Sequence, residues 1–126
     1  MHEILVVDDD PNSRKIIELM LSNQGFRLHL AEDGHEALAV LARETIDLVL
    51  LDLLMPRLDG FETAERIKAD PSLRGIPVIA VSALAFSSDR QEAARAGCDD
   101  YLTKPFTRKE LLEMIKRFAA RHQALA

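Results

Sequence analysis

Short apolar runs recur along the chain, and each of them stops at a polar residue. Three of these runs, 4–7, 48–51 and 77–81, show no alternation of apolar and polar positions. Such runs are typical of strands that are covered on both faces, as in the middle of a parallel sheet. Two more strands are expected: 26–31, which alternates enough to lie at a sheet edge with one wetter side, and the short 101–103.

Between these runs, apolar residues recur at helical spacing behind residues that favour helix starts. The expected starts are Asp10 with Pro11, Asp33, Asp59, Ser88 with Gln91, and Thr107 with Glu110. The residues expected to face inward are Ile16, Ile17, Met20 and Leu21, then Ala37, Leu38 and Leu41, then Phe61, Ala64 and Ile67, then Ala93, Ala94 and Ala96, and finally Leu111, Leu112, Ile115 and Phe118. Gly25 and Gly97 offer left-handed ends to the first and fourth helices.

Five strands that alternate with five helices predict an α/β fold. Connections of this length imply right-handed crossovers and a doubly wound parallel sheet with helices on both faces. The fourth helix has only alanines to bury, so it should be the least firmly packed element. One domain is expected over 1–120, followed by a short polar tail at 121–126.

Composition narrows the class of protein further. Of the 126 residues, 48% are apolar and 29% charged, which is typical of a globular protein. The net charge of −5 argues against a nucleic-acid partner, and no apolar segment approaches the roughly 20 residues of a membrane span. The single Cys98 suits a reducing compartment and a packing role. Because Met1 stands directly before the first strand without a signal peptide, a natural start and a cytoplasmic location are expected.

Polar side chains stand where the predicted strands end. Asp8 and Asp9 follow the first strand, Asp52 the third, Ser82 the fourth and Lys104 the fifth. In a parallel sheet these ends share one edge, so the five side chains should lie together. A single acidic residue after a strand is usually a helix cap, but five polar residues at strand ends indicate a site. Two carboxylates about 4 Å apart repel by roughly 4 kcal/mol at an effective dielectric of about 20, so the cluster needs a cation or a shifted pKa.

The donor set favours Mg²⁺ (or Mn²⁺), because carboxylates are hard oxygen ligands, whereas Zn²⁺ prefers histidine or cysteine. The four histidines do not fall at ligand spacing and are interpreted as ordinary surface or core residues: His2, His29, His35 and His122. A bound cation would let an acidic pocket accept a phosphoryl group. Asp52 can then be the nucleophile, with Lys104 and the Ser82 hydroxyl meeting phosphoryl oxygens.

These residues stand in segments that resemble a response-regulator receiver domain of two-component signal transduction, of the single-domain, chemotaxis-regulator-like kind. The resemblance covers essentially the whole chain and is carried, in order, by the segments 4–11, 52–60, 81–83, 96–102 and 104–106. It implies a flavodoxin-like sheet with strand order 2-1-3-4-5. It also implies a signalling domain rather than an enzyme.

The resemblance implies a role for each site residue. Asp52 would accept a phosphoryl group from a phosphohistidine on a histidine kinase or a phosphotransfer protein. Mg²⁺ would be held by Asp8, Asp9 and Asp52 and by the backbone carbonyl of Leu54. Lys104 would pair with a phosphoryl oxygen, and the bond from Lys104 to Pro105 would be cis.

The resemblance also implies an output. Ser82 would move toward the phosphoryl group and let Tyr101 turn inward, which would reshape the surface formed by the fourth helix, fifth strand and fifth helix. That surface would control a downstream protein, or the phosphoryl group would pass on in a phosphorelay. The chain would be a monomer or a phosphorylation-dependent dimer. Because Leu54 and Leu84 cannot orient a water molecule by hydrogen bonding, the phosphorylated state should be long-lived.

Three other functions fit the same architecture less well. A flavodoxin-like cofactor binder needs N–H donors after the first strand, where this chain has carboxylates and Pro11. A phosphatase with an aspartyl-phosphate intermediate usually has an acidic residue where this chain has Leu54. A receiver-like interaction module that no longer switches would have lost phosphorylation residues, and all of them are present.

Overall fold

The computed structural model describes residues 3–55, 58–84 and 86–125, with side chains as far as Phe118 in the last helix. The predicted turn residues Pro56 and Arg57, as well as His2 and the side chain of His122, lie outside this part. Strands and helices alternate as predicted: β1 (Glu3–Val7), α1 (Pro11–Met20), β2 (Arg27–Ala31), α2 (Gly34–Arg43), β3 (Leu48–Asp52), α3 (Gly60–Ala69), β4 (Val78–Ser82), α4 (Ser87–Ala96), β5 (Asp100–Thr103) and α5 (Arg108–Leu125). The residues predicted as a tail thus continue α5 as far as Leu125.

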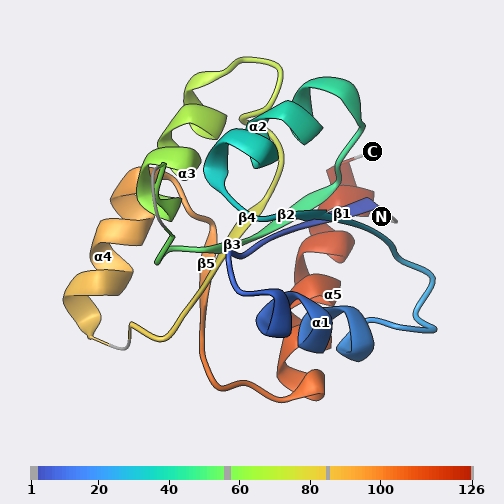
Figure 1. Cartoon of the computed structure of the whole chain (residues 1–126). Coiled ribbons are helices and arrows are strands. Elements are labelled where there is room, and N and C mark those ends of the chain that lie inside the picture. Colours follow the sequence, from blue (N-terminus) through green and yellow to red (C-terminus); the bar gives the residue numbers. More distant parts are fainter. Residues whose placement is uncertain (1–2, 56–57, 85, 126) are drawn as a thin grey trace.

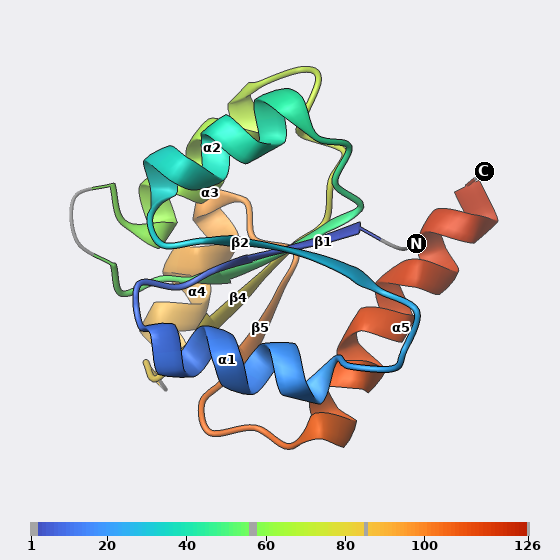
Figure 2. The same ribbon diagram turned by 45° about the vertical axis from the view of Figure 1, so that its right-hand side comes forward.

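The five strands form one parallel sheet in the order β2-β1-β3-β4-β5. Helices α1 and α5 cover one face, and α2, α3 and α4 cover the other (Figures 1 and 2). This arrangement confirms the predicted doubly wound α/β fold. The predicted edge position of the alternating strand is confirmed as well, because β2 pairs only with β1 in the sheet.

Alternate residues of the central strands supply a core on each face of the sheet. On one face, Ile4 and Val6 pack with residues of α1 and α5, among them Ile17 and Ile115. On the other face, strand residues pack with α2 and α3 and with the end of α4. Every residue of β3 and β4 is buried, which explains why these runs lack polar alternation.

At most of the predicted helix starts, the expected capping hydrogen bonds are present. The carboxylate of Asp10 accepts from the N–H of Asn12, and Pro11 is the first residue of α1. Asp33 and Asp59 each accept from the N–H three residues later. In front of α5, Thr107 and Glu110 cap each other's backbone N–H groups in both directions.

The predicted start of α4 is wrong. This helix begins at Ser87 after Phe86, and the carboxylate of Asp89 accepts from the N–H of Phe86 at 3.1 Å. The acidic side chain at the third helical position thus replaces the expected pair of Ser88 and Gln91. Gly97 does end α4 with φ of 105°, as predicted.

Two details of the helix faces also differ from the prediction. Ile17 of α1 and Leu21 just after it are buried, but Ile16 is 52% exposed because it lies about 100° around the helix from Ile17. The end of α1 is Met20 with Leu21 as its C-cap, so Gly25, which has φ of 83°, lies in the turn beyond it. In α4 only Ala93 and Ala96 are buried.

Two smaller expectations also have an outcome. Cys98 is half-buried against both the α2–α3 core and a small cluster under α4, and burial raises the pKa of its thiol to about 11, which fits a packing role. No helix within residues 3–55, 58–84 and 86–125 is long and apolar enough to cross a membrane.

Candidate metal and phosphoacceptor site

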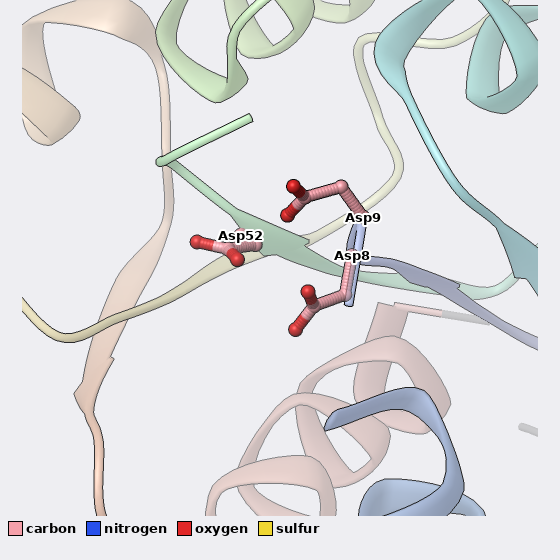
Figure 3. A group of neighbouring side chains, drawn as sticks. All are labelled: Asp8, Asp9 and Asp52. Carbon is pink, nitrogen blue, oxygen red and sulfur yellow. The ribbon is translucent and has the colours of Figure 1, made fainter. Parts of the chain in front are cut away.

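Three carboxylates gather at the carboxyl ends of two neighbouring strands (Figure 3). Asp8 and Asp9 follow β1, and Asp52 is the last residue of β3, which pairs with β1. One oxygen atom from each carboxylate lies within 4.8 Å of the others. Asp8 and Asp52 are buried and Asp9 is exposed, so the cluster opens to solvent on one side. A cluster of hard oxygen donors with an open side fits a divalent cation that keeps some of its water.

The lysine predicted for the site places its ammonium group between the two buried carboxylates. Lys104 follows β5, and its ammonium nitrogen is 2.9 Å from Oδ2 of Asp8 and 3.5 Å from Oδ2 of Asp52. Its backbone N–H donates to the carbonyl of Ser82 at 2.8 Å, which ties the loop after β5 to the end of β4. Burial disfavours the charged ammonium, but the hydrogen bond to Asp8 and the charge of Asp52 outweigh it and raise the pKa of Lys104.

The surroundings of Asp52 make its carboxyl group a weaker acid than an ordinary aspartate. The pKa of its carboxyl is raised from 3.8 to about 6 as the net effect of its surroundings, and burial is the largest cause. The N–H of Leu54, 3.0 Å from Oδ1, and the charge of Lys104 pull the pKa back down, while the carboxylate of Asp8 raises it further. A divalent cation between the carboxylates would remove this repulsion and leave Asp52 ionised, as a nucleophile must be.

The hydroxyl side chains beyond the carboxylates form a second small group. Ser82, fully buried at the end of β4, accepts from the N–H of Leu84 at 3.2 Å. Tyr101 is 8% exposed and its hydroxyl donates to the carbonyl of Leu84 at 2.6 Å. The tyrosine therefore occupies an inward position in this structure, and Arg90 of α4 lies over its ring at 5.1 Å.

The structure thus brings Asp8, Asp9, Asp52 and Lys104 together and places Ser82 on the neighbouring strand end. The bond from Lys104 to Pro105 is cis, as expected. His29 bonds to Glu3, which begins β1 at the opposite end of that strand from Asp8.

One contact of the site was not predicted from the sequence. Arg14 of α1 donates to the backbone carbonyl of Asp8 at 2.6 Å. A bond to a backbone atom leaves no motif in a sequence. The sequence feature that could have indicated this contact is a basic residue one turn into the helix that follows the acidic cluster.

Comparison with known proteins agrees with this geometry. The family model described as the response regulator receiver domain matches residues 4–116, a range that includes every residue of the site. The receiver domain of the sensor histidine kinase PA1611 from Pseudomonas aeruginosa, solved with a magnesium ion coordinated in its active-site cleft, is 39% identical. Its TM-score is 0.86, over 93% of this chain and 96% of that one.

Two curated relatives differ in how much of their own length this chain covers. A 14.6 kDa protein from Leptolyngbya boryana without a described function is 41% identical over 92% of this chain and 88% of its own length. The DNA-binding transcriptional regulator RpaA of Synechocystis is 35% identical over 96% of this chain, which spans only 50% of that regulator. The chain belongs to the response-regulator receiver domains of two-component signal transduction, which are signalling domains rather than enzymes in the usual sense.

Proposed function

We propose that this chain is a phosphorylation-dependent switch whose phosphoacceptor is Asp52. The observation that carries the proposal is the position of Asp52, which is buried beside two more carboxylates and within 3.5 Å of the ammonium of Lys104. A core would not collect these groups, because each buried charge costs free energy unless it is paired. Phosphoryl transfer uses them all, since it depends on positioning and on neutralising charge.

Mg²⁺ (or Mn²⁺) would be held by Asp8, Asp9 and Asp52 together with the backbone carbonyl of Leu54. The ion would supply charge neutralisation for the incoming phosphoryl group. The protein's own share of the step is to present one oxygen of Asp52 to the phosphorus of a phosphohistidine on a histidine kinase or phosphotransfer protein. The new O–P bond forms as the P–N bond breaks, and the electron pair of that bond returns to the histidine nitrogen.

The product would be recognised by the groups around it. Lys104 would move part of its hydrogen bonding from Asp8 to a phosphoryl oxygen, and the Ser82 hydroxyl would approach another. Because Ser82 and Tyr101 both contact the backbone of Leu84, this movement would reach the loop before α4. The α4–β5–α5 surface would then change, either to control a downstream protein or to allow the phosphoryl group to pass on in a phosphorelay.

Mass measurement after incubation with Mg²⁺ and a small phosphodonor tests the proposal. The wild-type protein should gain the mass of one phosphoryl group, and Asp52→Asn should gain none. Asp10→Asn is the matched control, because Asp10 stands in the same acidic loop but caps α1 instead of joining the cluster. An unmodified wild-type protein would instead favour an interaction module that does not switch.

A further inference from the structure

Every polar atom of Asp8 has a partner, and the partners come from separate parts of the fold. Its N–H donates to the carbonyl of Ala31 at 3.0 Å, and its two carboxylate oxygens accept from the N–H of Asp10 and the ammonium of Lys104, each at 2.9 Å. Its carbonyl accepts from Nη1 of Arg14 at 2.6 Å. These contacts hold both the backbone and the side chain of Asp8 in place.

The bond from Arg14 differs from the others because it fixes the peptide unit between Asp8 and Asp9. The orientation of this unit sets the direction in which the Asp9 side chain leaves the backbone. Within residues 3–55, 58–84 and 86–125, no hydrogen bond or ion pair involves the exposed carboxylate of Asp9. The direction of that carboxylate therefore depends on the backbone, and the backbone here is held by Arg14.

We propose that Arg14 is a positioning residue for the divalent cation: it holds the Asp8 carbonyl so that the Asp8 and Asp9 carboxylates face the same ion. This inference deepens the proposed function and rests on it. A guanidinium is suited to the task because its donors are fixed in a plane and its bond to a carbonyl is charge-assisted. Its half-buried position on the first turn of α1 also links the metal site to that helix.

The Kd of Mg²⁺, measured by titration calorimetry on the whole chain, tests this inference. Arg14→Ala should raise the Kd about tenfold, which is the usual effect of removing a residue that orients a metal ligand. The phosphorylation rate at saturating Mg²⁺ should fall by a smaller factor, because the ion restores the arrangement once it is bound. Arg14→Lys should lie between, since lysine keeps the charge but loses the planar donor set.

Arg108→Ala is the matched control. Arg108 also donates to a backbone carbonyl of α1, that of Met20 at 2.8 Å, but at the opposite end of the helix from the carboxylates. If Arg14 serves only to hold α1 against the sheet, both alanine variants should lower the free energy of unfolding. Both should then bind Mg²⁺ with the same Kd as the wild-type protein. We expect the Kd to rise in Arg14→Ala only.

A Kd for Arg14→Ala within twofold of the wild-type value, or an equal rise in Arg108→Ala, would overturn the inference and leave the proposed function standing. A wild-type protein that binds no Mg²⁺ would overturn both. If Arg14→Ala does not fold, Arg14→Lys decides: a Kd at least threefold above the wild-type value supports the positioning role, and an unchanged Kd contradicts it.

Discussion

Asp52 lowers the stability of the folded protein at neutral pH, because its carboxyl group is buried. Its pKa is raised to about 6 by burial, so the folded state binds the proton more tightly than the unfolded chain does. A raised carboxyl pKa destabilises the fold above pH 6, and this penalty disappears as the pH falls through about 6 toward 4. Without divalent cations, Asp52→Asn should therefore raise the free energy of unfolding at pH 7.5 by about 1–3 kcal/mol.

Urea unfolding in the presence of a chelator measures this difference between the two proteins. At pH 4 the difference between the two proteins should be small, because Asp52 is then protonated in the folded protein and about half protonated in the unfolded chain. A less stable Asp52→Asn protein at pH 7.5 would show that the pairing of Asp52 with Lys104 outweighs the cost of burial.

The lifetime of the phosphorylated state depends on the residues beside Asp52. Leu54 is 51% exposed and Leu84 is half-buried, and neither side chain can hold a water molecule for attack on the phosphoryl group. We expect the phosphoryl mass to persist for minutes or longer. Leu54→Asn should shorten the lifetime about tenfold by orienting such a water, which is less than the roughly 100-fold or more that a positioned general acid or base contributes.

Leu19→Asn provides the control for this substitution, because Leu19 is 60% exposed and lies on α1, outside the acidic cluster. Mass spectra taken at intervals after removal of the phosphodonor give the rates. Decay of the wild-type protein within seconds, without a phosphatase, would contradict the prediction.

The convergence of the five polar residues was predictable from the sequence, because parallel strands end at one edge. Their individual contacts were not. Lys104 bonds to Asp8 more closely than to Asp52, and Tyr101 already bonds to the Leu84 carbonyl, because these choices depend on side-chain packing that a pattern does not contain. The contact of Arg14 with a backbone carbonyl belongs to the same class.

At the scale of elements, the start of α3 approaches the end of β3 very closely at Gly60. A Cβ atom on Gly60 would lie 2.4 Å from the carbonyl oxygen of Asp52 and 2.4 Å from Cα of Leu53. Because both atoms belong to the backbone, Gly60→Ala must displace the chain that carries Asp52. We expect a loss of about 2 kcal/mol or more in the free energy of unfolding, and slower phosphorylation.

Gly75→Ala is the control for this substitution, since a Cβ atom there meets nothing within 4 Å. It should leave the stability unchanged or slightly higher, because alanine restricts the unfolded chain. Urea unfolding of both variants checks the prediction. Equal stability of the two would mean that the turn adapts at little cost.

Elements were easier to predict than their ends. The unalternating runs identified the buried strands because burial on both faces removes the need for polar positions. The start of α4 was missed because Asp89 caps the helix from inside it, and Ile16 was assigned to the wrong face because neighbouring residues lie 100° apart on a helix.

At the scale of the whole molecule, cation binding at the proposed site would compete with proton binding for the same carboxylates. Because only the folded chain gathers Asp8, Asp9 and Asp52, Mg²⁺ bound to them as proposed should raise the Tm. Because Asp52 must lose its proton first, the rise in Tm should be larger at pH 7.5 than at pH 5. Thermal unfolding with and without Mg²⁺ at both pH values measures this, and an equal rise at both would exclude Asp52 as a ligand.

The bond between Lys104 and Asp8 joins residues that are 96 positions apart in the sequence. Lys104 follows β5, which pairs with β4 in the sheet. During synthesis on a ribosome, Lys104 would therefore be the last group of the site to emerge, long after the three carboxylates. If phosphoryl transfer needs Lys104 as proposed, an unfinished or truncated chain would be a poor phosphoacceptor and would add no false signal.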